Sequence, residues 1–358
     1  MSDVMDRLEE MASELMATVP SDVIKGEVPV ALYGVGFLGR WAMAALPDAG
    51  IQISAAYDGN PALAGESVLG VPVRAADDIA REGAPLIFIG ARHAVPAVRA
   101  RLEGLGKASV STDAFFAAKD FAGFRQLNGR LADDRSRSVL AAVLEAMLTS
   151  DRVHLLPVFE KDQYFALPQF CGTEKEIYVD AGAYVGDSLE RFIWTHYGVF
   201  EHAIAFEPGR RQFAALGIRS ERLVTEWALD ARQIELVPAA LGVASAVEYA
   251  ASHSGELTSL AVGGGTEEIR VVKLDDHLGG ERITFLKADV EGMEMPLLRG
   301  AADSIRTFRP KLAICVYHYP TDMLMIYRYL QSLVPEYQFA LRHHSPQFLE
   351  TVLYAWVA

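Results

Sequence analysis

The chain contains one local pattern twice: an apolar run, a glycine-rich loop and then a helical run. The first copy is VPVALY (28–33) followed by GVGFLG (34–39), and the second is EIYVDAGAYVGDS (176–188). Further apolar runs of strand length, such as PLIFIG (85–90), alternate with segments of helical periodicity. This alternation is typical of parallel sheets covered by helices. The sequence therefore predicts an α/β protein with two doubly wound sheets.

The length of 358 residues suits two domains at about 150 residues each. We expect a leading helix over 1–27, a Rossmann-like domain over 28–113, a helical connection over 114–170 and a second α/β domain over 171–358. The final runs, YQFALRHH and ETVLYAWV, are joined by a short Ser-Pro turn and predict a hairpin with an antiparallel strand. In the second domain we expect strands at 177–180, 203–207, 233–238, 269–274, 283–288 and 311–317, and helices at 186–196, 208–216, 293–307 and 321–333.

Composition disfavours several classes of function. The chain carries 33 Lys and Arg against 47 Asp and Glu, a net charge of −14, so we expect no nucleic-acid and no membrane partner. Cys171 and Cys315 lack partners at metal-ligand spacing, which excludes a disulfide framework and a cysteine-rich zinc site. The N-terminus does not look like a signal peptide, and no apolar run approaches the ~18 residues that span a bilayer. The sequence predicts a cytoplasmic protein and leaves its oligomeric state open, a homo-oligomer included.

The second glycine-rich loop has the spacing of a nucleotide site. Gly182 and Gly186 lie between a strand and a helix, where glycine lets the backbone approach a ligand. Asp180 ends the strand, and Glu207 follows the next strand, 21 residues after Gly186. An acid at that place can accept the two hydroxyls of a ribose. The alternative is a glycine-rich turn that binds nothing.

Two further strands end in polar residues. KADVEG places Lys287, Asp289 and Glu291 after the apolar run ITFL, at the edge where open α/β sheets bind ligands. The alternative is a solvated turn whose acids favour a helix N-terminus. Tyr317 and His318 close KLAICVYH, and a histidine there can serve as a general base, or else form a hydrogen bond at the rim. The glycine-rich run 263–268 is either a mobile loop over the substrate or a plain hairpin turn.

The second half resembles the FkbM-type family of S-adenosylmethionine-dependent methyltransferases. The resemblance covers about 160–355 and rests on YVDAGAYVGDS, AFEP, PAALG, VVKLDDHL, LKADVEGMEMPLLRGA and RPKLAICVYH, in that order. It implies a class I methyltransferase fold over 171–358, with a seven-stranded sheet that contains one antiparallel strand. It also implies methyl transfer from S-adenosylmethionine to a hydroxyl group of a small molecule, such as a sugar, a nucleotide-sugar or a secondary metabolite.

The resemblance also assigns roles to residues. Glu207 would hold the ribose, the preceding loop would line the methionine end of the cofactor, and PAALG would lie against the adenine. His318 is the predicted general base, Asp289 would orient the acceptor or the base, and Lys287 would hold a polar group of the substrate. The predicted cofactor-binding residues are Asp180, Gly182, Ala183, Tyr184, Gly186, Asp187, Glu207, Ala240, Leu241 and Asp289. The predicted acceptor residues are Glu291 and Tyr317, and no metal site is predicted, because no third ligand to accompany Asp289 and Glu291 is evident from spacing.

The first half supports a competing function. Gly34, Gly36 and Gly39 follow a strand with the dinucleotide-binding spacing, and Asp58 lies 19 residues after Gly39. A nicotinamide-dependent oxidoreductase would use this loop, although no Tyr-x-x-x-Lys pattern follows it. The run DGNPALAGESVLGVPV resembles Rossmann-like domains beside sugar-modifying transferases, which bind a nucleotide-linked substrate or are purely structural. A scaffold or nucleotide sensor with both sites degenerate is the third alternative, which the intact second loop disfavours.

Overall fold

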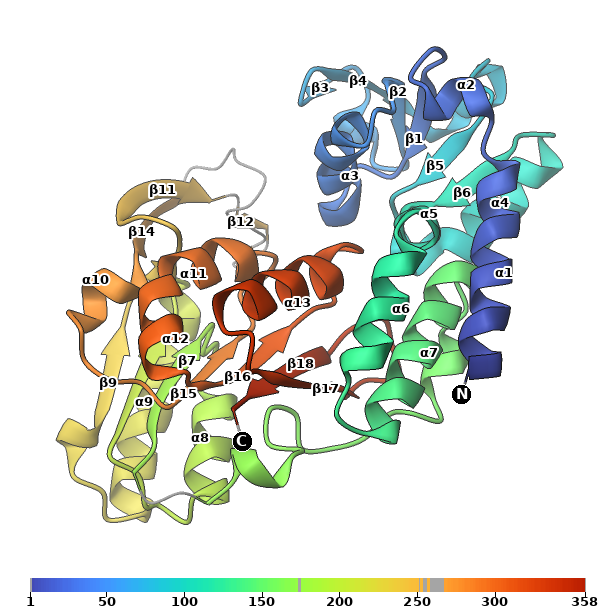
Figure 1. Ribbon diagram of the computed structural model, residues 1–358. Coiled ribbons are helices and arrows are strands. Elements are labelled where there is room, and N and C mark those ends of the chain that lie inside the picture. Colours follow the sequence, from blue (N-terminus) through green and yellow to red (C-terminus); the bar gives the residue numbers. More distant parts are fainter. Residues whose placement is uncertain (1, 173–174, 251, 254–255, 258–266, 358) are drawn as a thin grey trace. The chain divides into compact units, whose positions relative to one another are not determined.

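The computed structural model describes residues 2–172, 175–250, 252–253, 256–257 and 267–357 (Figure 1). These residues form two compact units, which we describe separately. Unit 1 comprises 1–126, 140–156 and 319–321, and unit 2 comprises 127–139, 157–318 and 322–358. The domain boundaries expected from the sequence stay predictions. Within the described ranges, every helix is too short or too polar to cross a membrane.

Unit 1 is built on a six-stranded sheet in the order β3-β4-β2-β1-β5-β6. The pairings are parallel except for the edge pair β3–β4. The glycine-rich loop follows β1 and leads into α3, as the sequence predicts. The strands are β1 (Val30–Tyr33), β2 (Ile53–Asp58), β3 (Ser67–Val68), β4 (Val71–Ala75), β5 (Ile87–Ile89) and β6 (Ser109–Ser111). The helices are α1 (Ser2–Thr18), α2 (Ser21–Ile24), α3 (Phe37–Asp48), α4 (Val95–Gly104) and α5 (Thr112–Lys119), while α6 (Phe121–Arg130) and α7 (Asp134–Thr149) contribute to both units.

Unit 2 is built on a seven-stranded sheet in the order β17-β18-β16-β15-β7-β8-β9 (Figure 1). Of its described strands, β18 alone runs against the others, so the α/β class and the terminal hairpin are confirmed. The strands are β7 (Ile177–Ala181), β8 (His202–Phe206), β9 (Ile234–Val237), β15 (Phe285–Ala288), β16 (Lys311–Cys315), β17 (Gln338–His343) and β18 (Thr351–Trp356). The helices are α8 (Asp187–Thr195), α9 (Arg210–Glu226), α10 (Leu274–Leu278), α11 (Glu294–Gly300), α12 (Ala302–Phe308) and α13 (Asp322–Leu333).

Two expected elements differ from the structure. The run 269–274 forms β14 (Glu267–Val272), which lies in a separate sheet between β10 (Ala240–Leu241) and β11 (Ala246–Ala250). An apolar run fixes the presence of a strand but not the sheet that it joins. The helix expected at 293–307 is divided into α11 and α12. A short hairpin, β12 (Ser252–His253) and β13 (Glu256–Leu257), completes the described strands, and most of the predicted loop at 263–268 lies outside the described residues.

The core of unit 2 fixes the two strands that carry most of the site. Tyr178 of β7 stacks on Phe192 of α8, with ring centroids 4.2 Å apart, and packs against Phe285 of β15 at 5.0 Å. Phe165 and Phe170, from the segment before β7, contact Phe285 edge-on. All five rings are buried. Close packing of this kind holds the carboxyl ends of β7 and β15 in one relative position.

Candidate active site

The loop after β7 approaches the turn after β15 so closely that only glycine fits at Gly182. Its φ is +73°, and a Cβ atom there would lie 1.9 Å from the carbonyl oxygen of Asp289. The Asp289 amide donates a hydrogen bond to the carbonyl of Ala181 (3.1 Å). Gly186 precedes α8 with a φ of +85°, and a Cβ atom there would lie 2.8 Å from the Leu216 side chain. Backbone contacts therefore join the loop and the Asp289 turn into one sheet edge.

Glu207 comes directly after β8 and turns back to the same loop. One carboxylate oxygen accepts a hydrogen bond from the Tyr184 amide (2.9 Å), and the other accepts one from the Gly209 amide (2.7 Å). Burial raises the pKa of Glu207 to about 7, although both backbone hydrogen bonds act in the opposite direction. A carboxylate at this edge can also accept hydrogen bonds from the two hydroxyls of a ribose.

Lys287 and Asp180 are opposite residues on β15 and β7 and form a buried ion pair. Nζ lies 3.1 Å from Oδ1 of Asp180 and donates a hydrogen bond to the Gly182 carbonyl (2.7 Å). Ser188 donates to the other Asp180 oxygen (2.6 Å). Burial by itself lowers the pKa of Lys287, but the charges of Asp180 and Asp289 raise it, so the ammonium stays charged. The burial of both groups favours a role in holding the loop over the ligand contacts that the sequence predicts for them.

Asp289 lies at the centre of the polar cluster. Tyr164 donates a hydrogen bond to its Oδ2 (2.8 Å), and Tyr317 donates to its Oδ1 (3.2 Å). Burial acts to raise the pKa of Asp289, but the charges of Lys287 and His318 hold it below the ordinary value. The sequence predicts Asp289 and Tyr317 as site residues but assigns no role to Tyr164, which reaches the site from a segment 125 residues away.

His318 is surrounded by three carboxylates. Its Nδ1 lies 3.1 Å from Oε1 of Glu294, and its Nε2 lies 3.6 Å from both Oδ1 of Asp289 and Oε2 of Glu291. Burial acts to lower the pKa of His318, but these carboxylates, Glu294 above all, raise it to about 10. The imidazole therefore carries a proton at neutral pH. Its role as general base stays a prediction, and this environment does not favour it.

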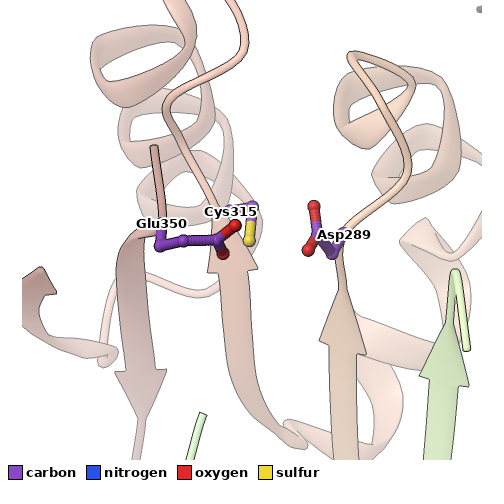
Figure 2. A group of neighbouring side chains, drawn as sticks. All are labelled: Asp289, Cys315 and Glu350. Carbon is purple, nitrogen blue, oxygen red and sulfur yellow. The ribbon is translucent and has the colours of Figure 1, made fainter. Parts of the chain in front are cut away.

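Glu350 is a site residue that the sequence does not point to. It precedes β18, and because β18 is antiparallel, its first residues lie at the same sheet edge as the ends of β15 and β16. Figure 2 shows Glu350, Cys315 and Asp289 facing one another, and their ligand-type atoms lie within 4.8 Å. Gln163 donates a hydrogen bond to one oxygen of Glu350. Burial, with the nearby Asp289 charge, raises the pKa of Glu350 to about 7.

The spacing of these groups could also accept a cation. Two sets of three ligand-type atoms lie within 4.8 Å: Asp289, Glu294 and His318, and Asp289, Cys315 and Glu350. In the first set the protonated His318 already supplies a positive charge among the carboxylates. In the second set Asp289 already accepts hydrogen bonds from two tyrosines. We therefore assign no metal to either set, and the predicted absence of a metal site stays untested.

The other predicted residues occupy several environments. Ala183 is buried, Tyr184 is half exposed, and Asp187 is exposed in the first turn of α8. The side chains of Ala240 and Leu241 are buried in β10. The next residue in that motif, Gly242, meets Gly300 at the end of α11, where a Cβ atom would lie 2.0 Å from the Gly242 carbonyl oxygen. This contact brings together PAALG and LLRGA, which are far apart in the sequence.

The glycine-rich loop of unit 1 repeats the arrangement around Glu207. Asp58 ends β2, and one of its oxygens accepts a hydrogen bond from the Val35 amide of the loop (2.6 Å). The other oxygen accepts one from the Asn60 amide, two residues further on (2.7 Å). In both units, therefore, the acid that follows the second strand is fastened to the amide of its glycine-rich loop.

Comparison with known proteins places the site within a family domain. Residues 180–339 match the profile of the methyltransferase FkbM domain. A search of curated proteins finds no significant match.

Solved structures share the fold. The methyltransferase FkbM from Methylobacillus flagellatus KT is 24% identical, with a TM-score of 0.63, and 99% of each chain is covered. Precorrin-6y C5,15-methyltransferase from Geobacter metallireducens is 14% identical over 51% of this chain and 81% of its own, with a TM-score of 0.29. Aeropyrum pernix fibrillarin, solved with S-adenosyl-L-methionine, is 13% identical over 51% of this chain and 67% of its own, with a TM-score of 0.30.

Proposed function

Because residues 180–339 form a methyltransferase FkbM domain, we propose that this protein transfers a methyl group from S-adenosylmethionine to a hydroxyl group of a small molecule. The observation that carries the proposal is the pairing of Glu207 with the loop amide of Tyr184 (2.9 Å) at the carboxyl edge of the sheet. This pairing supports binding of a ribose next to a loop that a second chemical group can approach.

The residues present fit this cofactor. Glu207 would accept hydrogen bonds from the ribose hydroxyls, and the loop from Gly182 to Gly186 would hold the methionine portion. When bound, S-adenosylmethionine supplies a methyl group on a positively charged sulfur. The carboxylates of Asp289 and Glu291 lie at the same edge, and negative charge there favours a cationic ligand.

The acceptor would lie against the polar cluster. Asp289 is held by Tyr164 and Tyr317, which fixes the direction of its oxygens. The side chain of Glu291 is 66% exposed and can contact a ligand from solvent. Carboxylates and tyrosine hydroxyls together suit a polyhydroxylated acceptor such as a sugar, free or linked to a nucleotide. The net charge of −14 argues against nucleic acid and anionic membranes as acceptors.

Thermal shift and product release test the proposal. S-adenosylmethionine and S-adenosylhomocysteine should raise the melting temperature of the full-length protein, whereas NAD and NADP should not. Release of S-adenosylhomocysteine is then measured with a panel of methyl hexosides, 6-deoxyhexosides, amino sugars and nucleotide-sugars. If neither adenosyl compound binds while NAD does, the methyltransferase proposal is wrong and the oxidoreductase alternative gains support.

A further inference from the structure

The structure leaves open which group receives the proton that an acceptor hydroxyl must lose. His318 is the natural choice from the sequence, but its side chain is 3% exposed and lies against the carboxylate of Glu294 at 3.1 Å. A base must lie within hydrogen-bond reach of the proton that it accepts and must not already hold one. Asp289 is a weak base as well, because two tyrosine hydroxyls and two nearby cations stabilise its charged form.

Glu350 has the properties that the other two groups lack. It reaches the cluster from the start of β18, on the far side of Asp289 from His318 in the order of the strands, and it is half-buried (Figure 2). Among the described residues, the hydrogen bonds found for its carboxylate involve one oxygen, which Gln163 holds. Gln163 also donates to the hydroxyl of Tyr164 (2.9 Å), so one side chain links the two carboxylates.

We propose that Glu350 is the catalytic residue that accepts the proton of the acceptor hydroxyl, and this inference rests on the proposed methyl transfer. In the transfer step, the acceptor oxygen forms a bond to the methyl carbon as the carbon–sulfur bond breaks. The electron pair of the broken bond stays on sulfur, whose positive charge is thereby neutralised. The hydroxyl proton passes to the Glu350 carboxylate and from there to solvent, so charge and atoms balance.

The environment of Glu350 supports this assignment. The groups that face it are Asp289 after β15, Cys315 in β16, Gln163 before β7, and the cations of Lys287 and His318. Burial and the Asp289 charge raise its pKa to about 7, while Gln163 and the two cations act to lower it. Two neighbouring carboxylates whose pKa values are driven apart are the usual arrangement of an acid–base site. Near neutral pH Glu350 can both accept a proton and release it.

Sinefungin provides a test that needs no acceptor. This analogue of S-adenosylmethionine carries an amine in place of the transferable methyl group, whereas S-adenosylhomocysteine has nothing there. Binding of both is measured by calorimetry at pH 6 and pH 8 in the wild type, in Glu350→Gln, and in Glu281→Gln, an exposed acid before β15. Because both compounds share the ribose, the ratio of their affinities cancels the contribution of Glu207.

The preference for sinefungin over S-adenosylhomocysteine should rise with pH in the wild type and in Glu281→Gln. In Glu350→Gln it should fall by about tenfold and lose its pH dependence, since a charged hydrogen bond is removed. If Glu350→Gln does not fold, Gln163→Leu leaves Glu350 in place and should move the midpoint of the pH dependence above that of the wild type. An unchanged preference in Glu350→Gln, or an unmoved midpoint in Gln163→Leu, overturns the inference.

Kinetics give the second measurement. On the best acceptor from the panel, Glu350→Gln should lower turnover by ~10²–10⁴-fold and remove the rise of turnover through pH 7. Affinity for S-adenosylhomocysteine should stay within a few-fold of the wild type. If turnover instead rises only through about pH 10, His318 is the base and Glu350 is not. If S-adenosylhomocysteine and sinefungin both fail to bind the wild type, the proposed function itself fails, which is a different outcome.

Discussion

Replacement of Glu207 by alanine tests the cofactor site most directly. The carboxylate accepts two backbone hydrogen bonds in the free protein and has the position to accept the ribose hydroxyls. A hydrogen bond to a charged group contributes about 1.5–3 kcal/mol, so Glu207→Ala should weaken binding of S-adenosylhomocysteine by ~10–150-fold. We expect micromolar affinity in the wild type. Isothermal titration calorimetry measures both values, with Glu201→Gln as a control, since that exposed acid lies just before the same strand.

The pKa of Glu207 gives the same prediction an independent readout. With a pKa of about 7, about one-tenth of the carboxyl is ionised at pH 6 and about nine-tenths at pH 8. Ribose hydroxyls donate to the ionised form, so affinity should fall by about tenfold from pH 8 to pH 6, because only the ionised fraction is competent. Glu207→Gln should bind weakly with little pH dependence. Equal affinities in the wild type and in both variants would refute the assignment of Glu207 to the ribose.

Four further outcomes follow from the same contacts. Gly182→Ala should destabilise unit 2 by at least ~1–2 kcal/mol in chemical denaturation, from the left-handed backbone alone, whereas Gly217→Ala, with open space around it, should not. Lys287→Met should cost about 3–5 kcal/mol, because it leaves the Asp180 carboxylate buried without its partner. The raised pKa of His318 means that its charge stabilises the fold fully below about pH 6.5 and ceases to do so as the pH rises through about 10, so the destabilisation of His318→Gln should shrink over that range. NAD and NADP at millimolar concentration should leave the melting temperature unchanged, and a saturable shift would favour the oxidoreductase alternative.

Local sequence patterns determine the elements of this protein and one half of its site. The apolar runs before Gly182 and Glu207 mark two strands, and a fixed spacing separates the loop from the acid. Because parallel strands end at one sheet edge, the residues that follow them must gather there. Asp289 and Tyr317 were predicted on this ground, and the structure brings them within hydrogen-bond distance of each other (3.2 Å).

The tertiary structure decided the other half. Glu350 precedes a strand, and a residue before a parallel strand would lie at the opposite edge of the sheet. Only the reversed direction of β18 brings it to Asp289 and Cys315. Tyr164 and Gln163 precede β7 and have no periodic signal, yet they hold the two carboxylates of the cluster.

The charges of the site were also decided by the fold. In the sequence, His318 is a group that titrates near neutral pH, and Lys287 is a cation at a strand end. The register of β15 against β7 places Lys287 beside Asp180, and the turn after β15 places Glu294 beside His318. Sequence periodicity encodes which residues form a strand and which face they share. The proton affinity of a side chain depends on the charges within a few ångströms of it, and those come from segments that only folding brings together.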